Sequence, residues 1–109
     1  MTRTLTALLV LGTLAACSPR DMADRMSRRT AETVVRPIVD DALTEPQALG
    51  VTRCIVTNAR PDEVQALLRY VGVYAGSSTV ATVAGILSRP ETQGCIRGSG
   101  LPVPVLGGL

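Results

Sequence analysis

The chain has 109 residues, which is enough for one small domain. Its formal net charge of +2 is too small to indicate nucleic acid or an acidic surface as a partner. It contains no histidine, and all of its basic residues are arginines. A histidine base, a Schiff-base lysine and a P-loop lysine are therefore excluded, and we expect no cofactor. With two tyrosines and no Phe or Trp, the core must be built from Val, Leu, Ile and Ala.

Residues 1–16 have the texture of a secretory leader. Arg3 is the only charge before residues 5–14, which are built from Leu, Val, Ala, Thr and Gly. A membrane-spanning helix needs about 20 apolar residues, and the polar residues 18–21 follow too soon for that. We therefore expect residues 1–16 to be a signal peptide that is removed.

The leader ends in Leu14, Ala15, Ala16 and Cys17, which resembles the lipobox of bacterial lipoproteins. The resemblance implies that the Cys17 thiol receives a diacylglycerol, that the preceding peptide bond is cut, and that fatty acids such as palmitate anchor the chain to a membrane. Two or more acyl chains give stable anchoring. Because Ser18 stands where an inner-membrane retention signal would have Asp, the sorting rule of Gram-negative lipoproteins predicts the inner leaflet of the outer membrane, facing the periplasm. The alternative is an ordinary secretory signal with an incidental cysteine.

Residues 17–20 are predicted to be a short tether, followed by a helix from about Asp21. Two series of residues recur there every three or four positions, which is helical spacing. They are Met22, Met26, Thr30, Thr33 and Pro37, and Val34, Ile38 and Ala42. Pro37 should kink or divide this helix, since it removes a hydrogen bond and crowds the preceding turn, and we expect a bend near Val35.

Arg25, Arg28 and Arg29 form a basic cluster in this first helix. The ordinary interpretation is a solvated face, because Asp24 and Glu32 lie close enough to compensate the charge. The alternative is a contact with lipid headgroups, which the neighbouring anchor makes worth stating.

Residues 44–47 read as Thr-x-x-Gln, which predicts a capping box at the start of a second helix with Pro46 in its first turn. Residues 51–57 are ambiguous, because β-branched residues are frequent and alternate as in a strand. No second strand of similar strength exists to pair with them. We therefore predict a short helix.

Pro61 should open the best amphipathic helix, with acids in its first turn. Gly76 should end it, and Ser77 or Ser78 should cap the next helix. The two helices are predicted to form an αα-hairpin. Its inner stripe comprises Val64, Leu67, Leu68, Val71, Val80, Val83 and Leu87, and the first helix is expected to continue to Ala75.

Ser88 and Glu91 predict a capping box around Pro90 and a last short helix that Gly98 ends. The predicted helical domain spans residues 21–98. The fold class is all-α: a small disulfide-stapled helical bundle of three to four helices with the hairpin at its centre.

Cys54 and Cys95 remain as a pair once Cys17 is lipidated, in a compartment that favours disulfides. A bond between them closes a loop of about 40 residues and is worth about 4 kcal/mol in the chain-entropy estimate. A metal site is much less favoured, because two cysteines without histidine fall short of four zinc ligands.

Residues 99–109 form a Pro/Gly-rich tail without charge, which we expect to be disordered or loosely docked. If the hairpin stripe is used by the core, the apolar residues left for a partner surface are Tyr70, Tyr74, Leu101, Val103, Val105 and Leu106. We predict that the tail and at least one tyrosine lie on the same side of the bundle.

Residues 31–97 contain a series of short motifs: Cys54-Ile55, Asn58-Ala59, Asp62-Glu63, Arg89-Pro90-Glu91-Thr92 and Cys95-Ile96. With this arrangement the segment resembles small alphaproteobacterial lipoproteins whose motifs have no assigned chemical role. Proteins of this kind are sometimes linked to succinate dehydrogenase. The residues do not support that activity, because the chain has no G-x-G-x-x-G motif and too few cysteines for an iron–sulfur cluster.

For catalysis only carboxylates and hydroxyls remain. The adjacent acids Asp40-Asp41 and Asp62-Glu63 do not face one another on a helix, so we predict that the protein is not an enzyme. The favoured hypothesis is a membrane-anchored periplasmic lipoprotein that acts as a non-catalytic binding or structural module and contacts an envelope protein. The alternatives are a binding protein for an apolar ligand or lipid and, less favoured, a carboxylate hydrolase.

Overall fold

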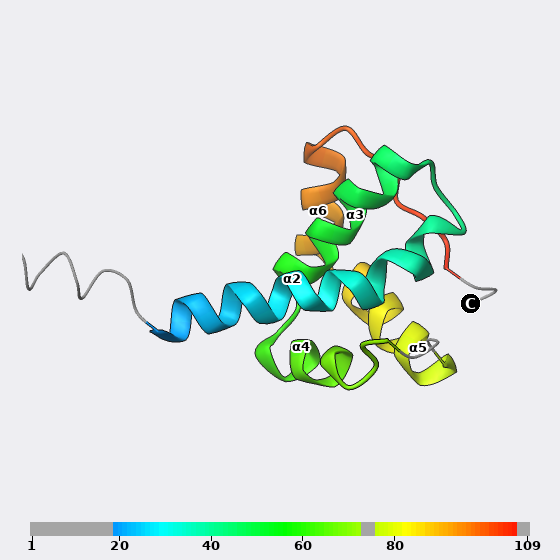
Figure 1. Ribbon diagram of the computed structural model, residues 1–109. Helices are drawn as coiled ribbons and strands as arrows, with labels where there is room; N and C mark the ends of the chain where they lie inside the picture. Colours follow the sequence, from blue (N-terminus) through cyan, green and yellow to red (C-terminus); the bar gives the residue numbers. More distant parts are fainter. Residues whose placement is uncertain (1–18, 73–75, 107–109) are drawn as a thin grey trace, which may run out of the picture.

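A computed structural model of the chain describes residues 19–72 and 76–106 (Figure 1). Within these residues all regular structure is helical, which confirms the predicted fold class. The helices number five in this part of the chain rather than three or four. They are α2 (Pro19–Asp40), α3 (Glu45–Asn58), α4 (Pro61–Leu68), α5 (Ser77–Leu87) and α6 (Pro90–Gly98).

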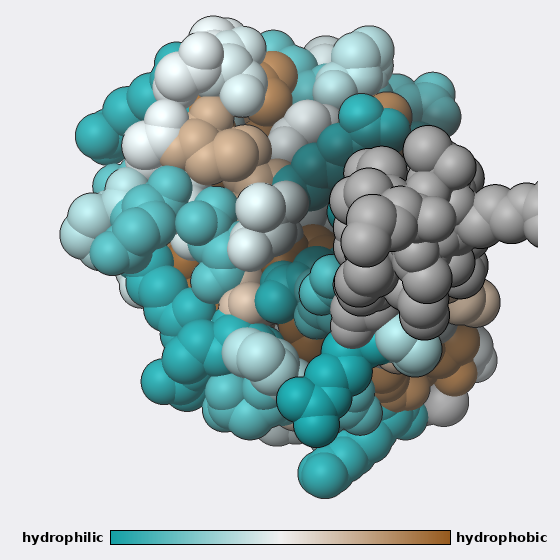
Figure 2. Space-filling view, turned by 90° about the vertical axis from the view of Figure 1, so that its left-hand side faces the viewer, coloured by the Kyte–Doolittle hydropathy of each residue, from teal (hydrophilic) through white to brown (hydrophobic). Residues whose placement is uncertain are grey.

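Helix α2 begins two residues earlier than predicted and continues through Pro37, which therefore does not divide it. Both Pro37 and Thr33, whose carbonyl loses its helical donor, are exposed, so that water can satisfy the freed group. The bend near Val35 stays a prediction. The first turns of α2 extend beyond the other helices in Figure 1, and the view from that side in Figure 2 shows a mainly hydrophilic face with apolar patches.

Helix α3 contains the ambiguous residues 51–57, and the prediction of a helix there is confirmed. At its start the Thr44 N–H donates to Gln47 Oε1 at 3.4 Å, which is the bond that Gln47 contributes to the predicted capping box. Its buried residues follow one another closely along the sequence. They are Ala48, Val51, Thr52, Cys54, Ile55 and Val56. A helix that is buried on most sides belongs in the centre of a bundle.

Helix α4 is shorter than the sequence pattern indicated. It ends at Leu68, and Gly72, at φ +75°, adopts a left-handed conformation that glycine favours. Val71 is 43% exposed, so the prediction that it lies in the inner stripe is wrong. Ala75 lies outside the described residues, and Gly76 caps α5 rather than ending α4.

The centre of the bundle is α2 against α3, not the pair α4 and α5. The most extensive contacts join α2 to α3, followed by α2 to α4 and α3 to α6, whereas α5 packs on α3 and α6. Contacts between α4 and α5 are few. The apolar stripes of the predicted hairpin are therefore buried mainly against the central pair.

Helix α6 ends in a turn that directs the tail back onto the bundle. Gly100, at φ +72°, donates its N–H to the Arg97 carbonyl at 3.0 Å, and the Leu101 N–H reaches the Ile96 carbonyl at 3.0 Å. These two bonds are the Schellman pattern with glycine in the left-handed position. Leu101 then packs on Gly50, where an added Cβ would come within 2.5 Å of Leu101 Cδ1.

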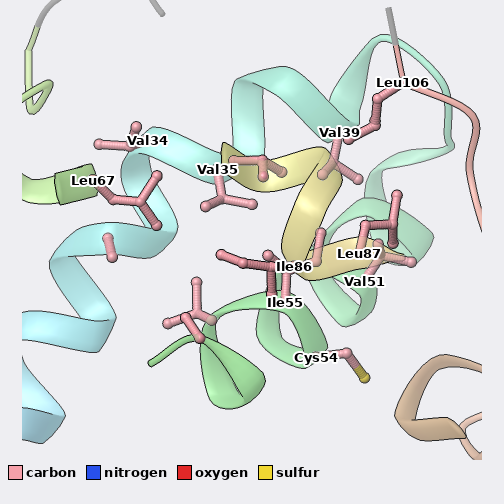
Figure 3. Packing of buried hydrophobic residues seen from close by; sticks show 14 of the residues in the cluster. Val34, Val35, Val39, Val51, Cys54, Ile55, Leu67, Ile86, Leu87 and Leu106 are labelled. Carbon is pink, nitrogen blue, oxygen red and sulfur yellow. The ribbon is translucent and has the colours of Figure 1, made fainter. Parts of the chain in front are cut away.

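The core unites side chains from all five helices and the tail (Figure 3). Leu106 from the tail lies beside Val39 near the end of α2 and is only 4% exposed. The disulfide between Cys54 and Cys95 joins α3 to α6 with a Cα–Cα distance of 5.7 Å, which confirms the predicted pairing. The bond thus closes one side of a core that lacks large aromatic side chains.

Candidate functional site

The most elaborate polar arrangement lies where α3 ends and α4 begins. Arg28 of α2 donates from Nη1 to the carbonyl oxygens of Val56 at 2.6 Å and Ala59 at 3.0 Å. Its Nε donates to Asp24 at 2.9 Å. The last carbonyls of a helix lack internal donors, so a guanidinium that binds them caps α3 from a neighbouring helix.

Arg89, just before α6, binds the same junction from the other side. Its Nη1 donates to the Asn58 carbonyl at 3.1 Å, and its Nη2 donates to Glu63 Oε2 at 2.5 Å. The other carboxylate oxygen of Glu63 accepts the Arg60 N–H at 2.8 Å. We call the side chains of Arg28, Arg89 and Glu63 the junction cluster.

The electrostatics of the junction cluster keep Glu63 ionised. Its side chain is 12% exposed, and this burial would raise its pKa. The hydrogen bonds from Arg89 and from the Arg60 backbone, together with both positive charges, outweigh burial and hold the pKa of Glu63 below its ordinary value. The hydrogen bond with Glu63 in turn raises the pKa of Arg89.

This chemistry suits a structural role better than catalysis. A general acid needs a raised pKa and a free proton, whereas Glu63 has a lowered pKa and uses both oxygens. Its neighbour Asp62 lies 3.4 Å from the Arg60 guanidinium, and Asp40 lies 3.9 Å from that of Arg36. Each of these carboxylates is thus paired with an arginine.

A small cavity lies between the end of α4 and the start of α5. Its volume is about 100 Å³, while pockets for small molecules usually measure about 300–1,000 Å³. Leu67, Arg69, Tyr70, Ser78, Thr79 and Thr82 are among its lining residues. Such a space does not fit a lipid, so this cavity does not favour the ligand-binding alternative.

The predicted partner surface is only partly available. Leu106 is buried, Leu101 and Val103 pack against the core, and Val105 is 78% exposed. The expectation of a disordered or loosely docked tail is therefore wrong for residues 101–106. Tyr70 is half-buried against the core, whereas Tyr74 and Cys17 lie outside the described residues.

The structure separates the three arginines that the sequence grouped together. Arg28 turns toward α3, whereas Arg25 and Arg29 are exposed. The capping role of Arg28 carried no sequence signal, because its carbonyl partners lie about 30 residues away. The bond from the Arg60 N–H to Glu63 did have a sequence signal, because an acid three residues after the N-cap of a helix is a known pattern.

Within residues 19–72 and 76–106, no three Cys, Asp or Glu side chains gather as a metal site would require. No described helix has both the length and the apolar character needed to cross a bilayer. Comparisons with protein-family models, curated proteins and solved structures find no match for this chain.

Proposed function

We propose that the protein is a lipoprotein of the bacterial envelope, anchored by acyl chains on Cys17, whose helical domain is a non-catalytic binding or structural module. The observation that carries the proposal is the sequence Leu14-Ala15-Ala16-Cys17 at the end of a short apolar leader. The proposed location is the periplasmic face of the outer membrane, because Ser18 follows the cysteine.

Two structural features support this proposal. Helix α2 begins at Pro19, so the folded domain starts two residues after the proposed acylation site. The Cys54–Cys95 disulfide is typical of proteins that mature in an oxidising compartment such as the periplasm.

The non-catalytic part of the proposal is supported by the state of the acids. Glu63, the most enclosed of the acids discussed above, is held ionised between Arg89 and the Arg60 backbone. A carboxylate hydrolase would need two carboxyl groups that face each other across a cleft with different proton affinities. A module that binds or braces another envelope component needs neither.

The test is incorporation of labelled palmitate in a bacterial host. We expect the wild-type chain to be labelled and Cys17→Ser to remain an unlabelled precursor, because the thiol is the acyl acceptor. Ser18→Ala is the matched control and should be labelled like the wild type. Equal labelling of wild type and Cys17→Ser would refute the anchor.

A further inference from the structure

The first turns of α2 present apolar side chains to solvent. Met22 is 60% exposed and Met26 is 68% exposed, whereas Ala31 and Val35 further along the same helix are fully buried. The two methionines are four residues apart and therefore neighbours on the helix surface, so they form an apolar patch rather than scattered exposed residues.

The exposed methionines share a helix face with two arginines. Met22, Met26 and Arg29 follow one another at intervals of four and three residues, so they form one stripe, and Arg25 lies beside it. The buried residues Ala31 and Val35 lie on the opposite side of the helix. We call Met22, Arg25, Met26 and Arg29 the α2 outer face.

The charge of this face is positive. In the described part of the chain, ion pairs engage Arg28, Arg36, Arg60 and Arg89, while Arg25 and Arg29 take part in none. Asp24, which precedes Arg25 in the sequence, pairs instead with Arg28, with 2.9 Å between Asp24 Oδ2 and Arg28 Nε. Asp21 and Glu32 lie along the edge of the face rather than within it.

The chain length limits how far this face can be from the proposed anchor. Met22 follows Cys17 by five residues, which span at most about 18 Å when fully extended. Met26 lies one helical turn beyond, about 6 Å along the axis. An acylated Cys17 therefore keeps the α2 outer face within reach of the bilayer surface.

We propose that the α2 outer face lies on the surface of an anionic lipid bilayer, with Met22 and Met26 in the interface and Arg25 and Arg29 on lipid phosphates. Helices that lie at a membrane interface insert apolar side chains among the headgroups and use basic side chains to attract anionic lipids. Long arginine side chains can reach the headgroups while their stems cover apolar surface. This inference rests on the proposed lipid anchor, which brings the face to the membrane.

The first test uses the chain from residue 17 with Cys17→Ser, which is lipid-free and retains the whole buried core from Ala31 to Leu106. Its binding to vesicles of phosphatidylcholine is compared with binding to an equimolar mixture of phosphatidylcholine and phosphatidylglycerol. We expect binding to the mixture only, weakening as salt is added. Arg25→Glu with Arg29→Glu should weaken it at least about 20-fold, roughly fivefold for each arginine.

The charge-matched control is Arg53→Glu with Arg97→Glu, at exposed positions of α3 and α6. It should bind within about twofold of the parent chain, because only charges close to the bilayer contribute strongly. Equal losses in both double variants would show a net-charge effect and overturn the proposal. Absence of binding to the mixed vesicles, or unchanged binding of Arg25→Glu with Arg29→Glu, would also overturn it.

The second test places one tryptophan in a chain that has none. The tryptophan fluorescence of Met26→Trp should be quenched by brominated lipid in the mixed vesicles. The fluorescence of Val105→Trp, on the exposed side of the tail, should not be quenched. Quenching at position 105 alone would assign the contact to the tail and refute the α2 outer face. The palmitate assay is independent of both tests. Labelling without vesicle binding would support the lipid anchor and refute the membrane contact of the α2 outer face. Vesicle binding without labelling would refute the anchor and support the contact.

Discussion

Replacing Leu106 by alanine tests whether the end of the chain belongs to the core. The side chain is 4% exposed and lies beside Val39, so almost all of its apolar surface is removed from water on folding. The change deletes three carbon groups, each worth about 0.8 kcal/mol of transfer free energy. The expected loss of unfolding free energy is therefore about 2.5 kcal/mol, which is at the low end of the range for a buried leucine.

Val105→Ala is the matched control, one residue away and 78% exposed in the wild type. It should change stability by less than about 0.5 kcal/mol, as most exposed substitutions do. Urea unfolding followed by far-ultraviolet circular dichroism measures both variants with the disulfide intact. The Leu106 variant should also melt about 10–20 °C lower, since about 1 kcal/mol shifts the midpoint of a domain of this size by about 4–8 °C.

Residues 101–106 are assigned to the core because Leu106 is buried, so Leu106→Ala must lower the unfolding free energy more than Val105→Ala does. If both leave the midpoint unchanged, residues 101–106 contribute nothing to the core and the tail returns to being a candidate partner surface. If both destabilise equally, the effect comes from the tail's backbone rather than from the buried Leu106 side chain.

Cys54→Ser with Cys95→Ser should lower the unfolding free energy by about 4 kcal/mol, because the disulfide closes a loop between residues 41 apart; a urea midpoint equal to that of the oxidised wild type would contradict this. Arg28→Ala should lower the unfolding free energy by about 1.5–3 kcal/mol, because it removes charged hydrogen bonds to the Val56 and Ala59 carbonyls. Arg29→Ala, at an exposed position, should leave the unfolding free energy nearly unchanged in the same assay. The lowered pKa of Glu63 predicts a stabilising contribution that is present above its ordinary unfolded pKa of about 4.3 and is lost as the pH falls through the lower folded value. Glu63→Gln should therefore destabilise the protein at neutral pH and reduce the decline of stability between about pH 5 and pH 3; parallel acid-unfolding curves for variant and wild type would count against the ion pair with Arg89.

The sequence alone determined the local structure well. Prolines at the first turns of α3, α4 and α6 marked where those helices begin, because proline fits the first turn and not the interior. The absence of a partner strand decided that residues 51–57 are helical. The even cysteine pair Cys54 and Cys95 determined the disulfide without knowledge of the fold.

Helix periodicity says which face of a helix is apolar, but not which element will cover it. The stripes of α4 and α5 were read correctly at Val64, Leu67 and Val83, yet they are buried mainly against the central pair α2 and α3 rather than against each other. Val71 continues the same period and is exposed, because α4 ends before it and the chain turns at Gly72. Tertiary contacts decided both outcomes.

The tertiary structure also decided the roles of residues whose partners are distant in sequence. Arg28 caps α3, while Arg29 next to it points to solvent, and only the position of Val56 and Ala59 in space distinguishes them. The tail looked unfit for a core because prolines and glycines cannot form a regular helix. The left-handed turn at Gly100 directs it back along α3, where Gly50 leaves space for Leu101 and the chain continues to bury Leu106.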